Sequence, residues 1–164
     1  MSNLIQALNS VDCENVDDAL ADVIFSVANK VAKARLDKRQ FLTSPDLAAD
    51  LLVQRYRHLD YEIFGIIYLD NQHRIIDIDE NLMSGTIDGA SIYPRRVLKA
   101  CLEKGAAAIC VFHNHPSGTT LASRADITIT NRISEALQYI DVRLLDHYIL
   151  GGGEFSSFAK NGIL

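Results

Sequence analysis

Two histidines lie close together in the second half of this 164-residue sequence, with a spacing that suits a metal ion. His113 and His115 are two residues apart at the end of an apolar, β-branched segment. Alternate side chains of a strand point to the same face, so the two imidazoles are expected to face one point. Pro116 cannot continue a central strand, which places the pair at a strand end. Two neutral imidazoles suit zinc, and a catalytic zinc site needs a third protein ligand and an open position for water.

Asp126 is the predicted third ligand. Ser123 is predicted to be the N-cap of the following helix, which places Asp126 in its first turn, facing the end of the strand. The same Ser-x-x-Asp pattern is typical of a capping box, in which the two side chains only close the first helical turn. A His-x-His pair can also be purely structural. The two interpretations of Ser123 are compatible, since a hydroxyl that caps a helix can also border a metal.

Glu62 is the predicted general base. It opens an otherwise apolar segment, where a charge is costly unless it is paired or functional. Zinc lowers the pKa of its bound water to about 7, and a nearby carboxylate can then carry the proton to the leaving group. The alternative is a solvated acid at the end of a strand.

Hydrophobic periodicity predicts the elements that must position these residues. Helices are predicted over residues 16–36, from Ser44 onward, over 94–104 and over 123–140. Strands are predicted over residues 63–69, 74–79, 106–112 and 142–150, and Gly151 to Gly153 are predicted to end the last one. The order favours one mixed α/β domain over residues 44–164, preceded by a helical arm over 1–43.

Composition narrows the class of protein. Hydrophobic residues make up 48% of the chain, enough for a real core, and the net charge of −5 leaves no broad basic surface for nucleic acid. The three cysteines, Cys13, Cys101 and Cys110, form no C-x-x-C pair and are predicted to be reduced thiols. No secretory signal or membrane-spanning stretch is recognised, so a cytoplasmic protein without a membrane partner is predicted.

The spacing of these residues resembles a known metallopeptidase pattern. Glu62, then His-x-His-Pro, then seven residues to Ser123 and two more to Asp126 resemble the JAMM family, and in particular its bacterial RadC-type (UPF0758-like) branch. The resemblance runs from about Ser44 to the C-terminus. The segments that carry it are Gly85-Thr86, Tyr93-Pro94-Arg95, His113 to Gly118, Ser123 to Asp126, Leu145-Asp146-His147 and Ser157-Phe158-Ala159.

The resemblance implies a fold and a reaction. The fold would be a cytidine-deaminase-like α/β/α sandwich with a mixed sheet, preceded by two N-terminal helices. His113, His115 and Asp126 would bind Zn²⁺. Glu62 would be the general base and Ser123 would help to hold the oxyanion. The reaction would be the hydrolysis of a peptide or isopeptide bond in a peptide or protein substrate.

The chain departs from the RadC-type pattern at two places. The helix-hairpin-helix region that precedes this domain in full-length relatives is not recognised here, so DNA binding by that route is unsupported. Arg96 stands where relatives usually carry a glutamate. The alternative is a non-enzymatic metal-binding module linked to DNA repair or mobile elements. Zinc-assisted deamination is disfavoured, because neither Cys101 nor Cys110 has the spacing of that ligand set.

The remaining histidines are predicted to play smaller parts. His58 and His73 lie in polar, exposed stretches and are expected to have no role at the metal. His147, beside Asp146, is either a core residue or a partner of a metal ligand, and a core position is favoured. The sequence leaves the substrate and the oligomeric state open.

Overall fold

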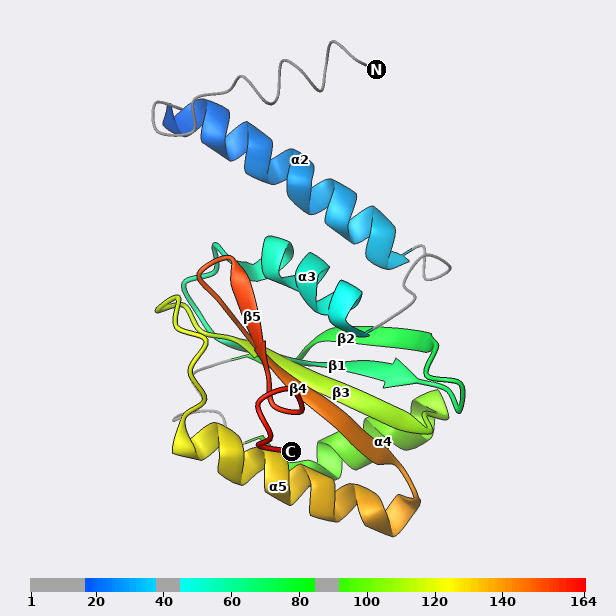
Figure 1. Ribbon diagram of the computed structural model, residues 1–164. Coiled ribbons are helices and arrows are strands. Elements are labelled where there is room, and N and C mark those ends of the chain that lie inside the picture. The colour runs from blue at the N-terminus through cyan, green and yellow to red at the C-terminus, as the bar shows by residue number, and fades with distance from the viewer. Residues whose placement is uncertain (1–16, 38–44, 85–91) are drawn as a thin grey trace.

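The computed structural model of the protein describes residues 17–37, 45–84 and 92–164 (Figure 1). The helices are α2 (Asp18–Asp37), α3 (Pro45–Tyr56), α4 (Pro94–Lys104), α5 (Arg124–Leu137) and a short 3-10 turn, η2 (Gln138–Ile140). The strands are β1 (Ile63–Leu69), β2 (Ile75–Ser84), β3 (Ala108–Asn114), β4 (Arg143–Gly151) and β5 (Glu154–Ser157).

The strands form one mixed sheet in the order β2-β1-β3-β4-β5. Strand β3 runs antiparallel to β1 and parallel to β4, and β2 and β5 lie antiparallel at the two edges. Helix α5 makes the crossover between the two parallel strands, as such a connection requires. The chain passes from the end of β3 through the loop of residues 115–123 into the first turn of α5.

Helices cover both faces of the sheet (Figure 1). On one face, Ala48, Ala49 and Leu52 of α3 pack on a core that includes Cys110 and Phe112 of β3. On the other face, α4 and α5 enclose a second core with Ile109 and Val111 of the same strand. Successive side chains of β3 therefore pack in opposite cores, because side chains alternate between the two faces of a strand. His113 continues the face that carries α5.

The mixed α/β fold and the sandwich expected from the sequence are confirmed. The second predicted N-terminal helix, α3, is itself one outer layer of that sandwich. Helix α2 packs against α3 on the side away from the sheet (Figure 1). The division at residue 43/44 stays a prediction.

One strand was not predicted. The three glycines expected to end the chain's last strand instead make a hairpin: Gly151 pairs with Glu154, while Gly152 and Gly153 have φ angles of 58° and 88°. Two consecutive positive φ angles are the mark of a tight turn whose twist matches the flanking strands. The turn allows β5 to add to the sheet edge.

Several boundaries also differ from the predictions. Strand β3 ends at Asn114 rather than at residue 112, and β2 continues to Ser84 rather than ending at residue 79. The helix predicted to run to residue 140 changes to a 3-10 turn after Leu137. Gly85-Thr86 and Cys13 lie outside the described residues. Among the helices that are described, none has the length and apolar character needed to cross a membrane.

Candidate metal centre

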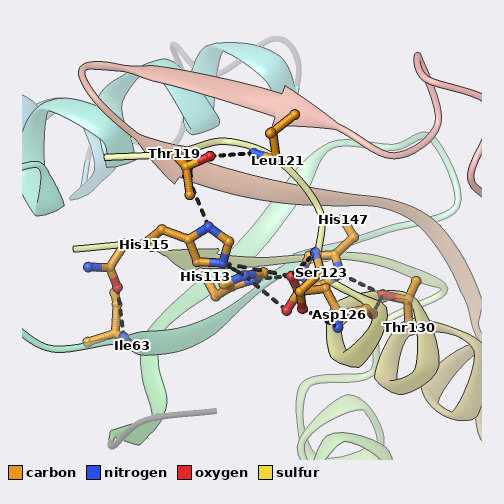
Figure 2. Close-up of polar contacts among 10 residues, drawn as sticks. Ile63, His113, His115, Thr119, Leu121, Ser123, Asp126, Thr130 and His147 are labelled. Atoms are coloured by element: carbon orange, nitrogen blue, oxygen red, sulfur yellow. Dashed lines mark hydrogen bonds and ion pairs between the residues drawn. The ribbon is translucent and has the colours of Figure 1, made fainter. Parts of the chain in front are cut away.

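Three side chains from the end of β3, the loop after it and the start of α5 converge at the carboxyl end of this central strand (Figure 2). Their potential ligand atoms all lie within 4.8 Å of one another. Nε2 of His113 is 2.9 Å from Nε2 of His115 and 3.3 Å from Oδ1 of Asp126. His113 and Asp126 are fully buried, whereas the His115 side chain is 11% exposed. The cluster could hold a metal ion with one side toward solvent.

The capping box of α5 is present and leaves one oxygen of Asp126 for a metal. Oδ2 of Asp126 accepts a hydrogen bond from the Ser123 backbone N–H at 2.7 Å, and Ser123 Oγ accepts from the Asp126 N–H at 3.1 Å. Oδ1 is buried and has no hydrogen-bond partner among the described residues. A buried carboxylate oxygen without a partner is costly. The capping interpretation of the Ser-x-x-Asp pattern is therefore confirmed, and it leaves Oδ1 of Asp126 available to a metal ion.

A chain of hydrogen bonds sets the tautomer of His113. Thr130 donates its hydroxyl hydrogen to the Asp126 carbonyl at 2.5 Å, so its Oγ1 is left to accept from Nδ1 of His147 at 2.6 Å. Nε2 of His147 is then unprotonated and accepts from Nδ1 of His113 at 2.8 Å. The hydrogen-bond partners of each ring nitrogen determine these tautomers. Nε2 of His113 consequently carries a lone pair.

A backbone carbonyl sets the tautomer of His115. Its Nδ1 lies 2.9 Å from the carbonyl oxygen of Thr119, which can only accept, so Nδ1 carries the proton. Thr119 belongs to the loop between β3 and α5, and its hydroxyl accepts from the Leu121 N–H at 3.2 Å. Nε2 of His115 therefore also presents a lone pair to the centre of the cluster (Figure 2).

The cluster is arranged for a cation. Two imidazole lone pairs and the unpartnered carboxylate oxygen of Asp126 face one another, an arrangement that is repulsive until a positive charge lies between them. Burial is the main cause that lowers the pKa of His113 to about 4, against the opposing pull of Asp126, and His115 lowers it further. The His113 ring is neutral at neutral pH, as a metal ligand must be.

Glu62 directly precedes β1, the strand that pairs with β3. Phe64 is the partner of His113 in the β1–β3 ladder, and Glu62 precedes β1 at the same end of the ladder at which His115 follows β3. Glu62 is half-buried and is not a member of the cluster of ligand atoms.

Asn114 fixes the backbone on both sides of Glu62. Its Oδ1 accepts a hydrogen bond from the Ile63 N–H at 2.7 Å, and its Nδ2 donates to the Tyr61 carbonyl at 3.0 Å. Asn114 is 3% exposed and lies in the chain between the two histidines of the cluster. One amide side chain thus ties the segment that carries Glu62 to the segment that carries the potential ligands.

His147 is held by segments that are far apart in the sequence. Its ring packs on Phe158 at a centroid distance of 4.7 Å, and its backbone N–H donates to the side chain of Asp146 at 2.7 Å. Asp146 also accepts from the Ser157 hydroxyl and from the Ala159 N–H. The Leu145-Asp146-His147 and Ser157-Phe158-Ala159 segments therefore meet behind the cluster.

The structure brings together three of the residues singled out in the sequence and adds others. His113, His115 and Asp126 converge, with Ser123 beside them. His147 is both a core residue and a partner of His113, two alternatives that the sequence analysis had set apart. Thr119, Thr130 and Asn114 were missed, since nothing in their local sequence distinguishes them from ordinary loop, helix and strand residues. His58 and His73 lie outside the cluster.

The fold and the cluster together define a class of protein. It is a mixed α/β sandwich with a potential metal site between the end of a central strand and the start of a helix. Residues 42–163 match the profile of the RadC-like JAB domain. The chain belongs to this family.

Proteins called UPF0758 are similar to this chain over most of its length. Those of Shewanella sp. (strain ANA-3) and Shewanella oneidensis are each 50% identical over 136 residues, which is 83% of this chain. That of Shewanella baltica (strain OS185) is 49% identical over the same length. The matched segment spans 60% of each of these relatives.

Proposed function

We propose that this protein is a zinc-dependent hydrolase of the metallopeptidase or isopeptidase type. His113, His115 and Asp126 are the proposed zinc ligands, Glu62 the general base and Ser123 a donor to the oxyanion. The observation that carries the proposal is the convergence of two imidazole lone pairs on a buried carboxylate oxygen that has no hydrogen-bond partner. Two nitrogens and one oxygen form a ligand set typical of catalytic zinc.

Each residue has a proposed task that its position supports. Zinc bound here would act as a Lewis acid on the scissile carbonyl and would lower the pKa of a bound water. Glu62, directly before the strand that pairs with β3, would take the proton from the attacking water and pass it to the leaving amine. Ser123 Oγ accepts one hydrogen bond, which leaves its hydroxyl hydrogen to donate to the developing oxyanion.

Metal analysis and a paired acid substitution test this proposal. Purified protein should contain about one zinc per chain, as a single three-ligand site requires. Glu62→Gln should keep its zinc and lose turnover of quenched peptides and isopeptide-linked peptides. The matched control is Glu135→Gln, an exposed acid on α5, which should keep both zinc and turnover.

Two results would contradict separate parts of the proposal. Full zinc content in His115→Ala would remove the ligand assignment. Unchanged turnover in Glu62→Gln would remove Glu62 as the base. Zinc-loaded protein without turnover on any amide would favour the non-enzymatic metal-binding module.

A further inference from the structure

The turn between β4 and β5 lies beside the loop that joins β3 to α5 and carries one potential ligand, His115 (Figure 1). The His115 backbone N–H donates to the Leu150 carbonyl at 2.8 Å, and the Gly118 N–H donates to the His115 carbonyl at 3.0 Å. Gly118 has a φ angle of 81°, a conformation that favours glycine. The loop therefore leaves the sheet through a tight turn whose first residue is hydrogen-bonded to the end of β4.

Gly151, the last residue of β4, is buried and has no room for a side chain. A Cβ atom at this position would lie 2.7 Å from the Thr119 carbonyl oxygen and 2.9 Å from the Gly118 carbonyl oxygen. Both distances are shorter than van der Waals contact allows, and backbone atoms cannot turn aside as the end of a side chain can. The φ angle of Gly151 lies outside the positive range that favours glycine. The neighbouring loop, rather than the backbone conformation, therefore requires glycine here.

The atom nearest to this Cβ position is also the atom that orients His115. The Thr119 carbonyl oxygen lies 2.9 Å from Nδ1 of His115 and accepts a hydrogen bond from it (Figure 2). One backbone oxygen is thus adjacent both to Gly151 and to the ring of a potential metal ligand. A displacement of this oxygen by a side chain at position 151 would act directly on the His115 ring.

The hydrogen bond to Thr119 opposes the other neighbours of the His115 ring. Nε2 of His115 lies 2.9 Å from Nε2 of His113 and 3.7 Å from Oδ2 of Asp126. Without a metal, these two acceptors favour the tautomer of His115 that carries its proton on Nε2. That proton would occupy the lone pair that a metal needs. The Thr119 carbonyl favours the opposite tautomer, so its position decides whether His115 is ready to bind a metal ion.

We propose that Gly151 is a positioning residue of the candidate metal centre. Because it lacks a side chain, the Thr119 carbonyl can lie where it holds the proton of His115 on Nδ1. A larger residue at position 151 displaces this carbonyl and weakens metal binding without removing a ligand. The proposal rests on the ligand assignment of the proposed function, since it concerns how one of those ligands is held.

The other two glycines of the hairpin provide matched variants. Gly152 and Gly153 both have positive φ angles, so a substitution by alanine strains the turn at either position. A Cβ atom at Gly152 would lie 2.8 Å from the Gly118 carbonyl oxygen, whereas a Cβ atom at Gly153 would meet no atom within 4 Å. Gly153→Ala therefore strains the hairpin without touching the loop that carries His115.

Competition with a chelator of known affinity tests the effect on the metal. Gly151→Ala should weaken zinc binding by about 10- to 100-fold, as the loss of a group that orients a ligand does. Gly153→Ala should bind zinc as the wild type does, although its melting temperature falls. Circular dichroism should show that both variants are folded. Equal losses of zinc affinity in the two variants would overturn the proposal, because they would trace the loss to the hairpin in general.

Nitrogen chemical shifts of the histidine rings in the metal-free protein test the tautomer itself. At about pH 8, above the usual histidine pKa of about 6.5, the wild type and Gly153→Ala should carry the His115 proton on Nδ1. Gly151→Ala should shift it toward Nε2. This measurement needs no zinc. A wild type that binds no zinc but shows this difference would contradict the proposed function and support the role of Gly151.

Two further results would overturn the role of Gly151. One is a folded Gly151→Ala protein with the zinc affinity and the His115 tautomer of the wild type. The other concerns Gly152→Ala, which keeps the test available if Gly151→Ala does not fold, since position 152 is exposed. Gly152→Ala displaces the carbonyl one residue before Thr119 and should bind zinc more weakly than Gly153→Ala. Equal zinc affinities in these two variants would be the contradicting result.

Discussion

Nε2 of His147 lies 2.8 Å from Nδ1 of His113 and accepts a hydrogen bond from its N–H group. His147 is fully buried, and its own proton is directed to Thr130. Because the orientation of each ring is fixed by the next group in the chain, the metal-facing nitrogen of His113 is unprotonated before any metal arrives.

We predict that His147→Ala weakens zinc binding by about 10- to 100-fold without removing a ligand. The substitution leaves Nδ1 of His113 without its acceptor and allows the ring to tilt or to change tautomer. Competition with a chelator of known affinity measures the loss. His58→Gln, on the exposed surface, is the control and should bind zinc as the wild type does. Equal affinities in His147→Ala and wild type would show that the tautomer needs no support.

Asp126→Asn separates the two tasks of Asp126. The asparagine oxygen can still accept from the Ser123 N–H and keep the helix cap, whereas the amide nitrogen replaces the oxygen that faces the histidines. We expect zinc to be lost while helix content stays constant. We also expect the metal-free variant to melt at a higher temperature than metal-free wild type, because its N–H groups can donate to the lone pairs of His113 or His115. A lower melting temperature would contradict the repulsive arrangement inferred for the cluster.

Much of this site could be predicted from the sequence because its positions follow local periodicities. The two-residue period of β3 places His113 and His115 on one face, and the capping pattern places Asp126 in the first turn of α5. Both are short-range rules that need no knowledge of the rest of the chain.

Other contacts around the site act across the sheet and could not be predicted. Asn114 bonds to the backbone at Tyr61 and Ile63, about 50 positions away in the chain, and Phe158 packs on His147 after the hairpin at Gly152 and Gly153. Such contacts depend on strand order and register, which hydrophobic periodicity does not specify. The helix over residues 16–36 was predicted from its apolar periodicity, but the exposure of Val23, Val27 and Val31 depends on which face of α2 is covered by α3.

Asn114→Ala tests how Glu62 is positioned. The substitution leaves the buried Ile63 N–H without an acceptor, at a cost of about 1–3 kcal/mol in the free energy of unfolding. The segment that carries Glu62 is then held less firmly against β3. If Glu62 is the base, kcat should fall about tenfold or more while zinc content and KM stay near wild type. Asn114→Asp, which retains the oxygen that accepts from Ile63, should recover part of the stability. A fall in zinc content that accounts for the whole loss of kcat would contradict this role.

Acid should destabilise the metal-free protein through its buried histidines. Burial, with the nearby His113 and His115 as smaller causes, holds the pKa of His147 well below its usual value. The pKa of a histidine in the unfolded chain is about 6.5, so the unfolded state binds the proton first as the pH falls. Stability present above about pH 6.5 is therefore lost progressively below it, whereas carboxylates that titrate near pH 4 do not yet contribute.

Urea unfolding of chelator-treated protein between about pH 7 and about pH 5.5 measures this dependence. His147→Gln can still accept from His113 but cannot take up a proton, so its stability should fall less steeply with acid than that of wild type. His73→Gln, a matched exchange at an exposed position, should leave the wild-type slope unchanged. Identical slopes for wild type and His147→Gln would show that His147 is not kept neutral by burial.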